Sequence, residues 1–248
     1  EGTAEAAASV AEAQPALVEE TARATDLPPP PSMRTLPARV DLSYRVFYGP
    51  LHIGNATYRF EHAANRYRIS TVGEARGLAA LILRGEGRVE SRGLITPAGL
   101  QPWELSVERG SRDKHESATF DWESGIATLS GDRTAALELP TFDPLSLMWQ
   151  FYFSPPSSDE QVFHLATTRR VIRLTVKREG TETVIWPYGE VEAERWHRTS
   201  PDGRTESIVW LAPGLRYLPI RMRVSNTLRG TLEVVLASIR VDDEVRVE

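Results

Sequence analysis

The chain contains no cysteine among its 248 residues. This absence excludes disulfide bonds, thiol catalysis, thiolate metal sites and a lipidated cysteine within the chain. Long hydrophobic runs are also lacking, since no stretch approaches the roughly 20 apolar residues that a membrane-spanning helix needs. We therefore expect no transmembrane span in this chain. Because the sequence begins with Glu1 and not with methionine, we expect that a signal peptide or an anchor was removed upstream.

Charge of one sign is not in large excess either. Lysine and arginine number 29 against 34 acidic residues, and the net charge of -5 is spread along the chain. Domains that bind nucleic acid carry a clustered basic surface, so we expect no nucleic-acid partner. The weak acidity mainly keeps a protein in solution.

The residue types that usually carry chemistry form no recognisable motif. The histidines lack the spacings that place two metal ligands on one helix face, so we expect no metal site and no cofactor. These scattered residues are His52, His62, His115, His164 and His197. A G-x-S-x-G nucleophile motif is missing as well, and we expect no catalytic residue. Acidic residues could still meet across a hairpin, which leaves a glycan hydrolase as an alternative; they are Asp113, Glu116, Asp121 and Glu123.

The first part of the chain differs in composition from the rest. Residues 1–37 are rich in alanine and glutamate, lack aromatic residues and contain four consecutive prolines in "LPPPPS". Proline runs favour an extended conformation, and short isolated helices are marginal in water. We predict a disordered tether over residues 1–37 and a single β-barrel-like domain over residues 38–248. A disordered tail without a function is the alternative for the first segment.

From Arg39 onward, apolar and polar residues alternate with period two, which is typical of half-buried strands. Glycine, proline and asparagine separate the alternating segments and predict short turns. The strongest segments are residues 39–48, 53–61, 66–74, 87–92, 103–109, 116–122, 125–129, 171–178, 182–186, 190–199, 205–211, 220–225 and 231–241. About a dozen antiparallel strands cannot stay flat. We therefore predict a mainly β fold, a curled antiparallel sheet that forms a half-open β-barrel.

Two segments depart from this alternation. The run from Leu78 to Leu83 is apolar throughout. In "FDPLSLMWQFYF", residues 142–153, Asp143 can cap a helix and Pro144 suits its first turn. A helix that is apolar nearly all round must be covered by protein or by a ligand. We predict two short helices that cover the concave side of the sheet.

Five stretches of the sequence carry a family resemblance in their order and spacing. "LSYRVFYGPLHIGNATYRF" gives a strand that ends in Tyr-Gly and a second strand that contains glycine, and "RYRI" follows. "FDWESGIATL", "DPLSLMWQFYF" and "VWLAPGLRYLPIRMRV" come later. Together they resemble a bacterial family of domains of unknown function, DUF3108, over residues 42–241. The resemblance implies a cell-envelope protein of Gram-negative bacteria, usually made with an N-terminal signal or anchor and without an assigned activity. A periplasmic location is therefore expected.

A shorter stretch is distantly similar to the periplasmic lipoprotein-carrier proteins, which have the LolA/LolB-like fold. In residues 210–213 and 218–221, an aromatic strand end, a turn and a Leu-Pro-x-Arg strand start follow one another. In those carriers, a curved antiparallel sheet with helices in its mouth holds acyl chains. The similarity thus implies a lipid or acyl-chain ligand.

These observations lead to one main hypothesis and two alternatives. The main hypothesis is a non-enzymatic envelope protein that binds an acyl chain or a lipoprotein lipid inside the half-open barrel. Its expected ligand-binding residues are Leu78, Leu81, Ile82, Leu147, Met148, Trp149 and Phe151. Trp122 and Trp210 are expected to pack in the core. The alternatives are an interaction module with a filled barrel, which meets an envelope protein partner, and the glycan hydrolase.

Overall fold

The computed structural model describes residues 37–72, 87–109 and 115–242, which belong to the unit Leu36–Glu248. Residues 1–36 of the predicted tether lie outside the described residues, and so does the predicted helix of residues 78–83. The account that follows concerns the described residues alone. None of the helices found there is long and apolar enough to cross a membrane.

The described elements are fifteen β-strands, one α-helix and one short 3-10 helix. They are β1 (Arg39–Tyr48), β2 (Leu51–Ala63), β3 (Arg66–Val72), β4 (Gly87–Thr96), β5 (Gly99–Arg109), β6 (His115–Asp121), β7 (Ile126–Leu129), β8 (Arg133–Ala136), β9 (Thr141–Phe142), α3 (Pro144–Phe153), β10 (Glu160–Ala166), β11 (Val171–Trp186), β12 (Gly189–Thr199), β13 (Thr205–Ala212), η1 (Pro213–Leu215), β14 (Leu218–Asn226) and β15 (Gly230–Asp242).

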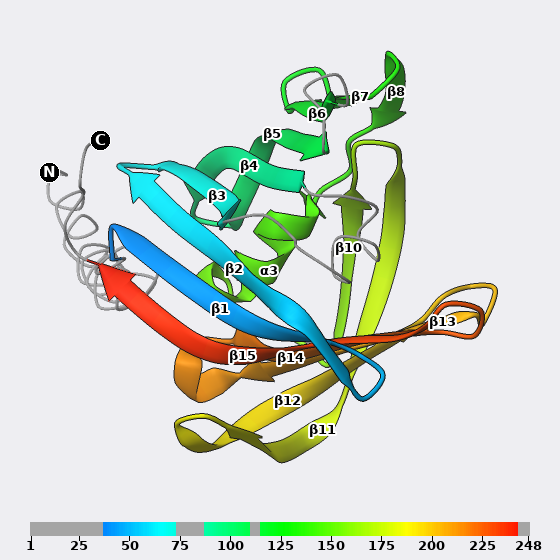
Figure 1. Cartoon of the computed structure of the whole chain (residues 1–248). Coiled ribbons are helices and arrows are strands. Elements are labelled where there is room, and N and C mark those ends of the chain that lie inside the picture. Colours follow the sequence, from blue (N-terminus) through cyan, green and yellow to red (C-terminus); the bar gives the residue numbers. More distant parts are fainter. Residues whose placement is uncertain (1–36, 73–86, 110–114, 243–248) are drawn as a thin grey trace, which may run out of the picture. The chain divides into compact units, whose positions relative to one another are not determined.

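All fifteen strands belong to one sheet, and each strand lies beside its neighbours in the sequence, except that β8 and β9 lie apart (Figure 1). The first and last strands, β1 and β15, pair along their whole length in the middle of the sheet. The two edges are β8 and β9, which are consecutive in the chain. Every pair is antiparallel except β9 and β10, which are parallel and are joined through α3. The sheet is therefore a long meander whose open side, called the seam here, lies between β8 and β9.

The sheet curls because several strands carry an extra residue that bends them. The register shifts at Ser43/Tyr44 in the pairing of β1 with β15 and at Arg92/Gly93 in the pairing of β4 with β5. Another shift lies at Arg178/Gly180 in the middle of the 16-residue strand β11. A β-carbon on Gly93 would meet the carbonyl oxygen of Gln101 and would lie 2.5 Å from the ring of Tyr67. This bend therefore requires a glycine.

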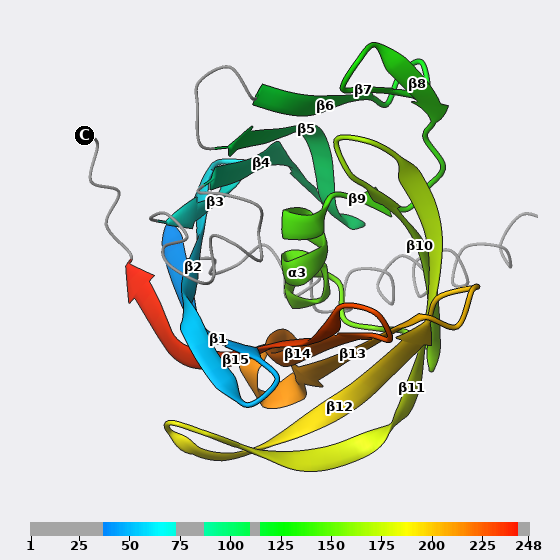
Figure 2. The same ribbon diagram turned by 45° about the vertical axis from the view of Figure 1, so that its right-hand side comes forward.

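The helix α3 lies inside the curl, enclosed by β-strands on several sides (Figure 2). This arrangement confirms the prediction of a mainly β fold with a curled antiparallel sheet, and it confirms that the apolar helix of residues 142–153 lies on the concave side. The strands number fifteen and not about a dozen, because β8, β9 and β10 are short segments without clear alternation.

The concave face is apolar because alternate residues of each strand point towards α3. On β1 these residues are Val40, Leu42 and Tyr44, which are all buried. Their cross-strand partners Phe60 on β2 and Leu236 on β15 are buried in the same cluster. The alternation read from the sequence thus identifies the face that packs against the helix.

Candidate functional site

The helix α3 begins at a buried carboxylate. Asp143 caps the helix by accepting hydrogen bonds from the backbone N–H groups of Leu145 (2.8 Å) and Ser146 (2.9 Å). Its other oxygen accepts a hydrogen bond of 2.5 Å from the hydroxyl of Ser91 on β4. Burial raises the pKa of Asp143, although these hydrogen bonds oppose the shift. The contacts attach the start of the helix to the wall of the sheet.

One side of α3 is packed completely against the sheet. Trp149 is fully buried, and its ring lies 5.0 Å from that of Phe60 on β2. Phe153 contacts the same ring at 5.4 Å, and Leu145 belongs to the same cluster. The indole N–H of Trp149 is buried without a hydrogen-bond acceptor. This side of the helix holds α3 in place and exposes no apolar surface.

The opposite side of α3 stays partly accessible. Four apolar or aromatic residues at positions i, i+1, i+4 and i+5 form a stripe there, called the α3 stripe: Leu147, Met148, Phe151 and Tyr152. Leu147 and Phe151 contact a cluster on β9, β10 and β11, and Phe151 stacks on Trp196 with ring centres 6.3 Å apart. Met148 and Tyr152 pack partly against the cluster that contains Trp149, and none of the four side chains is fully enclosed.

The structure brings together part of the set that was predicted from the sequence. Leu147, Met148 and Phe151 lie in the α3 stripe, whereas Trp149 points to the buried side and packs on Phe60. Leu78, Leu81 and Ile82 lie outside the described residues. Tyr152 was missed, and helical spacing signals it because it follows Met148 by four residues.

The predicted core tryptophans are held by hydrogen bonds as well as by packing. Trp122 donates its indole N–H to the carbonyl oxygen of Pro102 at 2.6 Å. Trp210 is buried and donates its own to Glu182. Both polar groups are satisfied within the fold, which supports a structural role for the two residues.

Two of the acidic residues that could have formed a hydrolytic pair, Asp121 and Glu116, make separate contacts. Asp121 accepts hydrogen bonds from the backbone N–H groups of Glu123 and Ser124, which lowers its pKa. Glu116 instead binds Thr168 and Arg169. Asp113 lies outside the described residues. Among the residues that the structure describes, no cluster of three or more histidine, aspartate or glutamate side chains could hold a metal ion.

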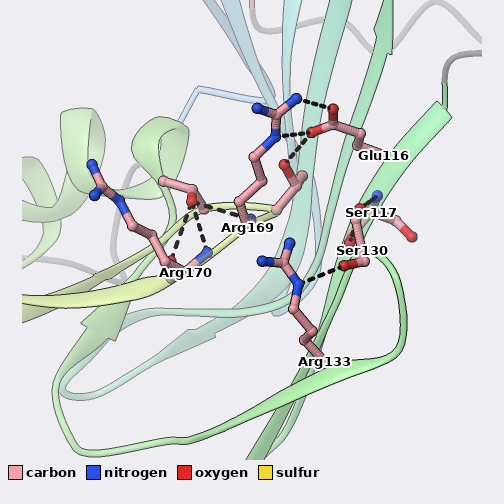
Figure 3. Close-up of polar contacts among 8 residues, drawn as sticks. Glu116, Ser117, Ser130, Arg133, Arg169 and Arg170 are labelled. Atoms are coloured by element: carbon pink, nitrogen blue, oxygen red, sulfur yellow. Dashed lines mark hydrogen bonds and ion pairs between the residues drawn. The ribbon is translucent and has the colours of Figure 1, made fainter.

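Polar contacts join the two walls near the seam, as Figure 3 shows. Glu116 on β6 accepts hydrogen bonds from Arg169 (2.6 Å) and from the hydroxyl of Thr168 (2.8 Å), both in the β10–β11 turn. The backbone N–H of Ser130 donates to the carbonyl oxygen of Thr168 at 2.9 Å. The contacts of Glu116 join segments more than fifty residues apart, and that of Ser130 also joins distant segments, so sequence reasoning had no signal for them.

A groove of about 500 Å³ is separate from the α3 stripe, since none of its lining residues belongs to α3. It lies between the far half of β11 and the outward residues of β1, β14 and β15, and its lining includes Phe47, Glu182, Ile185, Arg221 and Val235. Arg221 forms an ion pair with Glu233 within this lining. Oppositely charged groups neutralise one another there, and the groove presents no single ligand chemistry.

Comparisons with solved structures give low similarity. A β-barrel-like protein of the domain of unknown function DUF1849 from Brucella abortus matches with 13% identity and a TM-score of 0.47, covering 85% of this chain and all of that one. The lipoprotein LppX of Mycobacterium tuberculosis has 12% identity and a TM-score of 0.31, covering 95% of this chain and 100% of that one. A LolA-superfamily protein of Nitrosomonas europaea has 11% identity and a TM-score of 0.25, covering 84% and 86% of the two chains.

A comparison with curated proteins returns no match. The profile of one family, described as "Protein of unknown function (DUF3108)", matches residues 43–237, which is most of the folded unit. This match confirms the resemblance read from the sequence motifs. The chain belongs to the DUF3108 family of proteins of unknown function.

Proposed function

We propose that the protein binds an acyl chain or a similar hydrophobic ligand against the α3 stripe, within the curled sheet, and that it acts without catalysis in the periplasm. The observation that carries the proposal is the stripe itself, a row of large apolar side chains that the protein leaves partly accessible on a helix inside its own sheet. The sequence motifs that resemble envelope proteins support the location.

The free energy of such binding would come from removal of apolar area from water. Burial of about 400 Å² at about 25 cal/mol per Å² contributes about 10 kcal/mol. Lost translational and rotational freedom offsets a large part of it. The net affinity would suit a protein that binds and releases its ligand reversibly. Such binding needs no proton transfer and no nucleophile.

The two sides of α3 differ in burial, and this difference supports the proposed ligand binding at the level of single residues. Trp149 and Phe153 anchor the helix and cannot reach a ligand without displacement. Leu147 packs against the separate cluster on β9, β10 and β11, whereas Met148 packs partly against the cluster that contains Trp149 and Phe153. Leu147 can therefore be altered separately from the packing that anchors α3, and a variant at Met148 must first be shown to be folded.

The test measures the affinity of the full chain for palmitate. Binding is monitored through the displacement of a bound fluorescent fatty acid by palmitate. Leu147→Gln with Met148→Gln should weaken palmitate binding at least about tenfold, since each substitution removes apolar contact worth about 1 kcal/mol or more. The matched control is Leu137→Gln, a half-buried leucine that packs against a different cluster near β8. Unchanged palmitate affinity in a folded double variant contradicts the proposal.

The interaction module remains a second candidate because one side of α3 fills part of the barrel with tightly packed rings. Native mass spectrometry of protein taken from its own envelope distinguishes the two. A bound lipid mass favours the carrier, whereas a lipid-free protein in complex with another chain favours the module.

A further inference from the structure

Three turns of the domain are joined at one end of the sheet. The backbone N–H of Gly49 donates to the carbonyl oxygen of Thr231 at 2.9 Å. The hydroxyl of Tyr48 donates to the carbonyl oxygen of Arg229 at 2.6 Å. The N–H of Thr227 donates to the carbonyl oxygen of Arg204 at 3.0 Å. We call residues 48–51, 200–204 and 226–230 the turn cluster. These hydrogen bonds hold the three turns side by side.

The turn cluster exposes large apolar side chains where turns usually carry small polar ones. Leu228 is 81% exposed, Leu51 is 52% exposed and Tyr48 is 40% exposed. Single exposed apolar residues are common on proteins, but these three lie on turns that are bonded to one another. Val224, on the strand that leads into the third turn, is also exposed. The end of the domain is therefore apolar as a group.

The charge in the turn cluster is opposite in sign to that of the chain. Arg204 and Arg229 are exposed there, and Asp202 is the one acidic residue within these three turns, whereas the whole chain has a net charge of -5. Asp202 is already engaged, because it accepts hydrogen bonds from the hydroxyl of Ser200 and the backbone N–H of Arg204. The cluster is therefore apolar and net positive.

A second apolar tip on the same domain has the opposite surroundings. In the β11–β12 turn, Ile185 is 77% exposed and Tyr188 is 67% exposed, but the exposed charges that follow are Glu190 and Glu192. Exposed apolar area alone thus does not single out the turn cluster. The turn cluster differs from this second tip because it combines exposed apolar area with exposed arginine side chains.

We propose that the turn cluster docks the domain onto an anionic lipid surface. Leucine side chains at projecting turns can enter the boundary between headgroups and acyl chains, and the tyrosine ring suits the interface itself. Long arginine side chains reach lipid phosphates while their aliphatic stems stay in the apolar layer. Exposed leucines beside exposed arginines match an apolar layer that is bounded by anionic headgroups.

The inference goes beyond ligand binding and can fail independently of it. A carrier of acyl chains must reach a bilayer, but a protein can dock on lipid without an internal ligand site. The two proposals use different residues, since the turn cluster contains none of the α3 stripe. Solution binding of palmitate therefore tests one, and vesicle binding tests the other.

The experiment is flotation of the full chain with vesicles of equimolar phosphatidylglycerol and phosphatidylethanolamine, compared with phosphatidylcholine vesicles. The wild-type chain should float with the anionic vesicles and much less with the neutral ones, and high salt should reduce its binding. Leu51→Ser with Leu228→Ser should lower the vesicle partition coefficient at least about tenfold, because two leucines lose their insertion. Arg204→Glu with Arg229→Glu should lower it as well.

The matched control is Ile185→Ser with Tyr188→Ser, which removes two similarly exposed side chains from the acidic tip. It should leave binding within about twofold of wild type, because this tip lacks the arginines that favour lipid phosphate. All four positions of the two serine pairs are exposed, and circular dichroism verifies that the folds are kept. Failure of the wild-type chain to float, or equal losses in both pairs, overturns lipid docking. Palmitate binding retained in that case leaves the proposed function standing.

Discussion

At the residue scale, Asp143 combines two opposing demands. As the helix cap it accepts three hydrogen bonds that favour an ionised carboxylate. Complete burial disfavours the charge and raises the pKa of the group. The hydrogen bonds of Asp143 are all made within the fold, so we assign it to anchoring α3 and not to catalysis.

This conflict predicts a dependence of stability on pH. With the folded-state pKa raised, the folded chain binds the proton of Asp143 more tightly than the unfolded chain does. The resulting stabilisation is complete below the ordinary pKa of 3.8 and is lost as pH rises through the higher folded value. Asp143→Asn keeps a capping side chain and does not titrate. The free energy of unfolding of wild type minus that of Asp143→Asn, measured by urea unfolding, should therefore decrease from acid towards neutral pH. A difference that is constant with pH contradicts this prediction.

Sequence reasoning located this residue but not its surroundings. Asp143 and Pro144 predicted where the helix begins, because capping is a local property of adjacent residues. Its bond to Ser91 could not be predicted, because Ser91 lies 52 residues away and meets Asp143 only through the fold. The same holds for Trp149, whose buried position is decided by the ring of Phe60 and not by helical spacing.

At the scale of elements, the bends of the strands decide where the sheet can close around α3. The register shift at Gly93 brings the β4–β5 pair against the ring of Tyr67. Glycine leaves room there that no other residue leaves. The bend belongs to the pairing of three strands, and a single strand examined alone would not reveal it.

Gly93→Ala should lower the free energy of unfolding by about 1–3 kcal/mol, because the added methyl group overpacks against Tyr67 and the backbone of Gln101. Gly214→Ala is the matched control, since a β-carbon there meets nothing within 4 Å. Urea unfolding of both variants measures the difference. Equal stability of Gly93→Ala and wild type would show that the sheet can shift without cost.

At the scale of the whole domain, the contacts near the seam connect the two halves of the meander. The β10–β11 turn reaches β6 and β7 through Glu116, Arg169 and the backbone of Ser130 (Figure 3). Arg169 is more than half exposed, so water weakens its ion pair with Glu116. We infer that these contacts orient the walls and contribute little to the total stability.

A double-mutant cycle of Glu116→Gln and Arg169→Gln should give a favourable coupling energy that is small and decreases with added salt, because the pair is exposed to water. Hydrogen exchange at the amide of Ser130, which bonds across the seam, should accelerate in the single variants. The control cycle combines Glu116→Gln with Arg133→Gln. Arg133 donates to the carbonyl oxygen of Ser130. Equal coupling in the two cycles would contradict a specific contact across the seam.

The amino-acid sequence by itself determined the local features of this protein. Alternation over residues 39–48 identified a strand and its buried face, and the capping residues identified the start of α3. It also placed the chain in its family, because the motifs keep their order and spacing. These properties depend on residues close together in the chain, so period and capping chemistry reveal them.

The tertiary structure decided everything that depends on distant residues meeting. It paired β1 with β15, left the open side between β8 and β9, and divided α3 into an anchored side and an accessible stripe. It also joined three turns into one apolar, positive tip. The physical reason is that strand pairing and side-chain burial depend on which segments the curled sheet brings together, and local propensity carries no record of those partners.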